Sequence, residues 1–297
     1  MKLKHCLIVL FQTLLLVGCE DVIEVEVPDV PPKLIVEGLI RVNIQEPFIP
    51  VRIGLKESSG FFEPVPSINA ENINIYVERF ENGNLVSTFT SSLAEEFPGS
   101  GTYVPDPNAT FDQRIPTFFL EDEVRFTLQI RYKNRQYLAQ TWYVPVVPID
   151  YILQGKGTLQ GGNDTEVLVA FTDPPQEANY YLFDFGAGSF LPTEDTYYNG
   201  QFFQFSYFYD EKVAPGIELS IGILGADKNF YDYMRLLLDQ SERGGPFQTP
   251  VASARGNIWD VTGINNQDNF DNTLEPEVFA LGYFAVVQQH IRTLKIQ

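Results

Sequence analysis

The sequence predicts a mainly β protein, with an N-terminal β-sandwich of immunoglobulin or transthyretin type and a second β-rich domain that carries one amphipathic helix. Three observations predict this class. Short stretches of alternating apolar and polar residues recur along the chain, turn residues separate them, and a single stretch at residues 228–242 has helical spacing. The chain of 297 residues is long enough for two such domains.

The first 18 residues predict a signal peptide. Lys2 and Lys4 precede an apolar stretch at residues 6–17, which is too short to span a bilayer as a mature helix. Residues 16–19, Leu-Val-Gly-Cys, resemble a bacterial lipobox. We therefore expect Cys19 to carry a diacylglycerol and an N-linked acyl chain such as palmitate, and to anchor the protein at a membrane. The alternative is an ordinary cleaved signal followed by a chance cysteine.

Residues 19–32 predict an anchor followed by an extended tether. The stretch is acidic and contains Pro28, Pro31 and Pro32, which disfavour both a helix and a central strand. The acidic residues after Cys19 resemble the surface-export signals of Bacteroidetes lipoproteins in part. We expect the outer membrane as the location, on its cell-surface or periplasmic face.

Residues 33–145 predict the β-sandwich domain. Expected strands lie at residues 33–42, 49–55, 73–80, 85–89, 124–132 and 136–144. In the third of these, Ile73, Ile75 and Val77 share one face, as expected for a strand that is half buried. The Asn-Gly pair at residues 82–83 predicts a tight hairpin, and Lys-Asn at 133–134 predicts a second turn.

Residues 149–297 predict the second domain, since the prolines at 145–148 interrupt the run of strands. Expected strands lie at residues 166–172, 180–185, 202–209, 216–224, 278–287 and 291–296. Asp227 can cap the helix at 228–242, and Gly-Gly-Pro at 244–246 would end it. The apolar face expected for this helix is Phe230, Met234, Leu237 and Leu238 with Ser241.

Several motifs, in this order along the chain, resemble the DUF4249 lipoproteins of Bacteroidetes. After the lipobox they are Lys-Leu-Ile-Val-Glu-Gly at 33–38, Phe-Thr-Leu-Gln-Ile at 126–130, Tyr-Leu-Ala-Gln-Thr at 137–141, Val-Pro-Ile-Asp at 147–150, Gly-Pro-Phe at 245–247, Pro-Val at 250–251, Gly-Asn-Ile at 256–258 and Leu-Gly-Tyr-Phe-Ala at 281–285. The resemblance implies an outer-membrane lipoprotein that works beside a TonB-dependent receptor. It carries no catalytic residues across.

Composition argues against several classes of function. The formal net charge of −19 disfavours nucleic acid and anionic lipid headgroups as partners. Once Cys6 leaves with the signal and Cys19 is lipidated, no thiol remains for a disulfide, a metal or a nucleophile. His290 is then the one histidine for a metal site or a triad, and we interpret it as a surface residue. We therefore expect no enzyme activity, no cofactor and no metal.

Two stretches are candidates for binding. Phe203, Phe205, Tyr207 and Tyr209 fall on one face of the strand at 202–209, where they would form either core packing or an aromatic platform for a ligand. Residues 265–272 are rich in Asn and Asp, which is compatible with calcium, but they lack the order of a calcium-binding loop and read as a solvated loop.

The expected function is that of an accessory or ligand-capture partner of a TonB-dependent uptake receptor. A structural or adhesive surface lipoprotein is the alternative from another class. A hydrolase is a third possibility, and it would need carboxylates clustered in a cleft.

Overall fold

The computed structural model describes residues 31–60, 63–121, 123–159, 162, 164–175, 177–241, 254–263 and 279–297. The chain divides into a small unit, Met1–Pro31 with Ser59–Pro64, and a large one, Pro32–Ser58 with Val65–Gln297. The described part of the small unit holds a turn in which the Ser59 hydroxyl donates to the Glu63 carbonyl oxygen at 3.0 Å.

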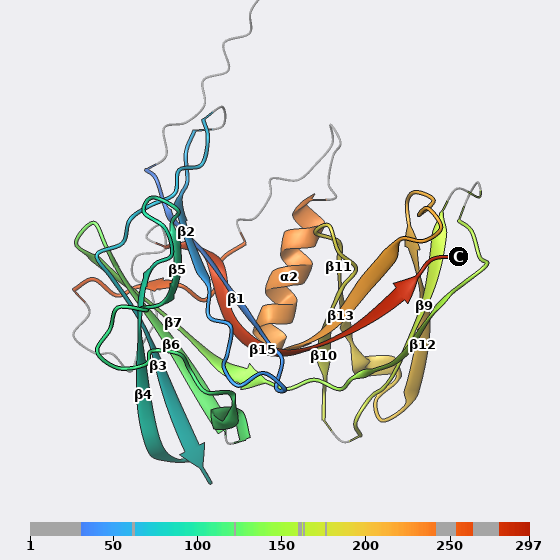
Figure 1. Ribbon diagram of the computed structural model, residues 1–297, viewed down its shortest axis with the longest axis horizontal. Helices are drawn as coiled ribbons and strands as arrows, with labels where there is room; N and C mark the ends of the chain where they lie inside the picture. Colours follow the sequence, from blue (N-terminus) through green and yellow to red (C-terminus); the bar gives the residue numbers. More distant parts are fainter. Residues whose placement is uncertain are drawn as a thin grey trace, which may run out of the picture. The chain divides into compact units, whose positions relative to one another are not determined.

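A closed, barrel-like sheet of eight strands combines seven strands between residues 34 and 144 with the last strand of the chain (Figure 1). In pairing order the strands are β15 (Leu281–Lys295), β1 (Leu34–Val42), β2 (Ile53–Glu57), β5 (Thr102–Pro105), β4 (Asn84–Glu95), β3 (Asn72–Glu81), β6 (Glu123–Tyr132) and β7 (Arg135–Val144). The ring closes where Tyr143 and Val144 of β7 pair with Val286 and Val287 of β15. β15 runs parallel to both β1 and β7, and the other neighbours are antiparallel.

The core of this closed sheet follows from period-two alternation. In β3, Ile73, Ile75 and Val77 are buried, and in β6 the residues that pair with them are buried as well. The other face of the same strands carries mostly polar side chains, and most of these are half-buried or exposed. The two predicted turns are confirmed: Asn82 and Gly83 have φ of 50° and 76°, and the Lys133–Asn134 pair is similar at 49° and 58°.

The second half of the unit continues the sheet and adds a smaller one. Beyond the closed ring, β15 pairs with β13 (Glu218–Ala226), followed by β10 (Tyr180–Asp184) and β11 (Phe190–Glu194). A separate three-stranded sheet contains β12 (Phe202–Tyr209), β9 (Thr165–Thr172) and β8 (Ile149–Gln154). Apolar residues from both sheets, such as Phe171 of β9 and Phe183 of β10, form one shared core. Short elements complete the described chain: β14 (Trp259–Asp260), η1 (Thr117–Glu121) and η2 (Asp195–Tyr197).

The helix α2 spans Lys228–Ser241, where the sequence spacing indicated one. Asp227 caps it, since its carboxylate accepts the Phe230 backbone N–H at 2.7 Å. Its buried residues are Phe230, Tyr231 and Met234, which pack with residues of β10, β13 and β15. Leu237, expected on the apolar face, is 41 % exposed. The expected stop at residues 244–246 lies outside the described residues.

The mainly β class with one helix is confirmed for the described chain, whereas a sandwich of immunoglobulin type is not confirmed. The two strands expected at 278–287 and 291–296 are one continuous strand, β15. The polar residues at 288–290 suggested a break, but there the strand passes from pairing with β1 to pairing with β13, and buried Gln288 accepts the Val146 N–H at 3.0 Å. The boundary predicted at residues 145–148 lies between β7 and β8 and stays a prediction.

Candidate functional site

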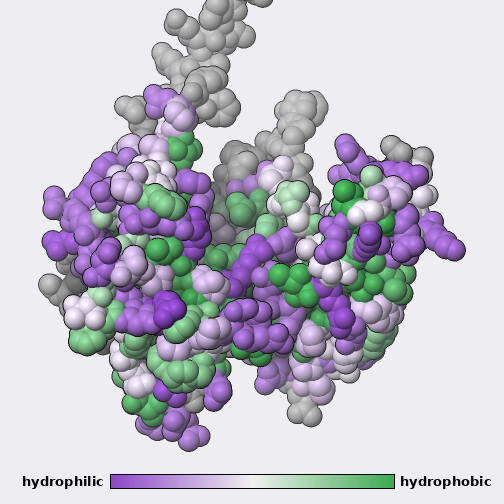
Figure 2. Space-filling view, in the orientation of Figure 1, coloured by the Kyte–Doolittle hydropathy of each residue, from purple (hydrophilic) through white to green (hydrophobic). Residues whose placement is uncertain are grey.

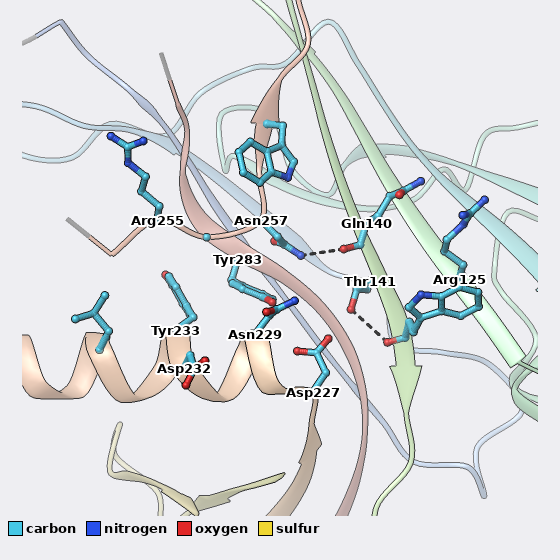
Figure 3. Close-up of a pocket in the computed structure, with 14 residues that line it drawn as sticks. Arg125, Gln140, Thr141, Asp227, Asn229, Asp232, Tyr233, Arg255, Asn257 and Tyr283 are labelled. Atoms are coloured by element: carbon cyan, nitrogen blue, oxygen red, sulfur yellow. Dashed lines mark hydrogen bonds between the residues drawn. The ribbon is translucent and has the colours of Figure 1, made fainter. Parts of the chain in front are cut away.

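A cavity of about 540 Å³ lies beside α2, lined by residues of β6, β7, α2, β15 and the segment 254–259. Figure 3 shows Asp227 at the start of the helix, Arg255 and Asn257 on the segment that crosses beside it, and Arg125 and Gln140 on the neighbouring strands. We call it the tryptophan pocket. Its defining residues are Arg125, Trp142, Asp227, Arg255, Trp259 and Tyr283.

The pocket contains both tryptophans of the chain. Trp142 is 46 % exposed and Trp259 is 36 % exposed. Each tryptophan therefore leaves a large part of its ring surface uncovered, although this side chain is highly buried on average in folded proteins. On the face drawn in Figure 2, hydrophilic residues predominate among scattered hydrophobic ones. Two open indole rings in one cavity indicate a binding surface.

Strand register places Trp142 next to Arg125 on the outer face of the closed sheet. The Arg125 guanidinium lies 5.8 Å from the Trp142 ring centroid and 5.2 Å from that of Phe80. Arg125 also donates from Nε and Nη2 to the two carboxylate oxygens of Glu78, at 2.8 and 3.0 Å. This fork holds the guanidinium in a fixed plane beside the indole, and the pairing raises the pKa of Arg125.

The helix supplies a wall of carboxylates and amides. One carboxylate oxygen of Asp227 accepts the hydrogen bond that caps the helix, and the positive end of the helix dipole stabilises the negative charge of this carboxylate. Asp232, one turn later, pairs with Lys228 and, at 3.7 Å, with Arg235. Asn229 also lines the cavity, and its side chain is exposed. This wall therefore offers planar hydrogen-bonding groups.

Two tyrosines form the aromatic part of the floor. The rings of Tyr233 and Tyr283 lie 4.8 Å apart, and Tyr283 also contacts Phe230 at 5.1 Å between centroids. Burial raises the pKa of both phenols above the ordinary value. Each hydroxyl therefore stays protonated at neutral pH and can both donate and accept a hydrogen bond.

The segment 255–257 is pinned against the sheet. The Asn257 side chain donates to the carbonyl oxygens of Gln140 (3.1 Å) and Phe284 (2.8 Å) and accepts the Phe284 N–H at 2.8 Å. A Cβ on Gly256 would lie 1.6 Å from the Gly282 carbonyl oxygen, so only glycine fits there. This close approach positions Arg255, whose guanidinium lies 4.1 Å from the centroid of the Phe279 ring.

The described lining of the pocket combines aromatic rings with polar side chains. Among the described residues that line it, none is His, Cys, Ser or Lys, whereas two carboxylates, Asp227 and Asp232, are present. The Thr141 hydroxyl donates to the Trp142 carbonyl oxygen at 3.2 Å. What the lining presents is aromatic faces between planar polar groups, the combination that orients small ligands.

The structure places the four predicted ligand-binding residues elsewhere, on β12. Phe203, Phe205, Tyr207 and Tyr209 are half-buried and pack against the core shared by the two sheets. Tyr207, for example, stacks on Phe185 with centroids 3.5 Å apart. This placement matches the core-packing interpretation of the strand, and a ligand-binding role for it stays a prediction.

The remaining sequence candidates fall into two groups. Cys19 and the residues 265–272 lie outside the described residues. His290 is half-buried, with Nε2 3.0 Å from Nε2 of Gln288. Within the described ranges, no group of three or more His, Cys, Asp or Glu side chains is placed to hold a metal ion.

Sequence reasoning did not single out the tryptophan pocket. The available signal was small: the chain has two tryptophans, and Trp142 follows Gln140 at the polar phase of an alternating strand, where an apolar ring is out of place. The rest of the site is assembled from elements far apart in sequence.

The model of a family described as "Domain of unknown function (DUF4249)" matches residues 20–292. No curated protein matches the chain. In the part of the chain that the structure describes, none of the helices has the length and apolar character needed to cross a membrane.

Proposed function

Because the chain belongs to the DUF4249 family, we propose that it is an outer-membrane lipoprotein that captures a small ligand in the tryptophan pocket for a TonB-dependent uptake receptor. Three features of the sequence support the location: the basic start, the short apolar run and the Leu-Val-Gly-Cys motif at residues 16–19. Lipid on Cys19 would hold the pocket at the membrane surface.

A single observation carries the binding role: the only two tryptophans of the sequence share one open cavity with arginine and aspartate side chains. The cavity volume, about 540 Å³, falls in the range of about 300–1,000 Å³ that small-molecule sites occupy. Two half-exposed indoles in a polar cavity favour a binding role over a purely structural one, because exposed apolar rings that gather in a cavity are typical of binding surfaces.

The test of the partnership is purification of a tagged full-length copy from gently solubilised outer membranes, followed by mass spectrometry. A TonB-dependent receptor recovered in near-equal amount supports the proposal. Recovery of the lipoprotein alone contradicts the receptor partnership and favours a free-standing binder or an adhesive surface protein.

The anchor is tested separately with Cys19→Ser. We expect this variant to lose its membrane association and to appear in the soluble fraction, because no acyl chain can be attached. Labelled palmitate should enter the wild-type protein and not the variant, and a wild-type protein without label contradicts lipidation at Cys19.

A further inference from the structure

We infer that the ligand of the tryptophan pocket is a neutral saccharide, with a pyranose ring stacked on at least one of the two indoles. This inference rests on the proposed binding role and names its ligand class. It is argued from the charges of the lining, its hydrogen-bonding groups and its exposed rings.

The charges of the pocket are balanced. Among its described lining residues are two arginines, Arg125 and Arg255, and two aspartates, Asp227 and Asp232. Arg125 is already paired with Glu78, and Asp232 is paired with Lys228 and Arg235. An ion that binds at Arg125 or Asp232 would have to compete with these partners, and an anion at Arg255 would meet the field of a chain with a formal net charge of −19. The pocket therefore favours a ligand without net charge.

The polar groups of the pocket suit hydroxyls. Arg125 has five N–H donors, of which the Glu78 fork uses two, and the Asn229 amide is exposed. Asp227 has a second carboxylate oxygen beyond the one that caps α2. A guanidinium, a carboxylate or an amide can make two parallel hydrogen bonds to neighbouring atoms. Adjacent hydroxyl groups on a sugar ring fit this geometry, because each hydroxyl can donate or accept.

The exposed rings supply the apolar half of the recognition. One face of a pyranose ring presents C–H groups, and these pack on the flat, electron-rich face of an aromatic ring. Trp142 and Trp259 keep 46 % and 36 % of their surface exposed, and they lie on different strands, β7 and β14. The register places Trp259 opposite Leu138, four residues along β7 from Trp142, so the two indoles can contact different sugars of one chain.

Tryptophan fluorescence makes the experiment site-specific, because every tryptophan of the sequence lines the pocket. Full-length protein in detergent is titrated with maltotetraose, cellotetraose, mannotetraose and N-acetylchitotetraose, and in parallel with free amino acids and dipeptides. We expect a saturable change in emission with at least one tetrasaccharide. Its affinity should be nearly independent of salt, because screening weakens the binding of charged ligands much more than that of neutral ones.

Variants locate the site. At least one of the variants Trp142→Ala and Trp259→Ala should weaken saccharide binding by about tenfold or more in calorimetric titration. Trp142→Phe, which keeps an aromatic face, should lose less. Tyr197→Ala is the matched control, because the Tyr197 ring lies outside the pocket and is 91 % exposed. The affinity of this variant for the saccharide should equal that of the wild-type protein. Circular dichroism confirms that each variant is folded.

The outcomes separate the two proposals. A response to dipeptides or amino acids without one to the saccharides overturns the saccharide inference and leaves the binding role standing. No response to either panel overturns both. Saccharide binding that persists unchanged in both tryptophan-to-alanine variants refutes the assignment to this pocket.

Discussion

Replacing Asn257 by alanine should destabilise the protein by about 3 kcal/mol. The side chain makes three hydrogen bonds to backbone groups of two strands, two of them to the completely buried Phe284. Each such bond contributes about 0.5–1.5 kcal/mol net, and a buried group left without its partner costs about 1–3 kcal/mol. Three bonds near the middle of the first range give the stated value. The same change releases the segment that carries Arg255 and Trp259.

The measurement is urea unfolding followed by far-UV circular dichroism, with the midpoint compared at unchanged slope. Asn229→Ala is the matched control: this side chain also lines the pocket but is exposed, so we expect a change within about 0.5 kcal/mol. Asn257→Asp should destabilise the protein at least as much as Asn257→Ala does. The aspartate side chain cannot make the two donated hydrogen bonds, and its carboxylate would face two carbonyl oxygens. If Asn257→Ala and Asn229→Ala unfold at the same urea concentration, the pinning argument is wrong.

Three further predictions concern stability. Gly282→Ala should destabilise the protein by about 3 kcal/mol or more in the same urea assay, because φ is +95° and a Cβ would lie 1.9 Å from a backbone oxygen of β1. Gly216→Ala is the control: φ is +91° there but the surrounding space is open, so this variant should show the backbone strain alone. Asp227→Ala should lower the unfolding free energy by about 1 kcal/mol through loss of the α2 cap, and Asp227→Asn should restore most of it; equal losses contradict the cap. Burial raises the pKa of Tyr143 to about 12 in the folded protein, against about 10 in the unfolded chain. The protonated phenol therefore stabilises the folded state fully below about pH 10, and this stabilisation is lost as the pH rises to about 12. Unfolding free energies across that range should fall less steeply in Tyr143→Phe, and an identical slope would refute the assignment.

Local features of the fold could be predicted from the sequence, because their causes are local. The hairpin turn at Asn82–Gly83 needs positive φ at both positions, and Asn and Gly adopt it readily. The helix α2 has a cap residue and helical spacing, both visible in a short window. Closure of the sheet by β15 was not predictable in this way, since its partners β1 and β7 lie far away in sequence and alternation does not record which strand is the neighbour.

The candidate site escaped prediction for a related reason. Its two indoles come from β7 and β14, and its polar groups from β6, α2 and the segment before β14. A run of aromatic residues in one strand is conspicuous in sequence, but on β12 these rings mostly fill a core. An aromatic side chain at the polar phase of a strand, as at Trp142, is the less conspicuous signal that marks the pocket.

The position of β15 in the ring also sets the order in which the chain can fold. β1 is the first described strand, and its parallel neighbour is the last, with Ile35 opposite Leu281 and Val42 opposite Gln288. A chain released residue by residue can form the β3–β4 and β6–β7 hairpins early, since their contacts are local. It cannot close the ring or seal the core within it until residues 281–295 are available. We therefore expect slow folding in a single late step, with the edges of β1 and β7 open to chaperones until the final strand arrives.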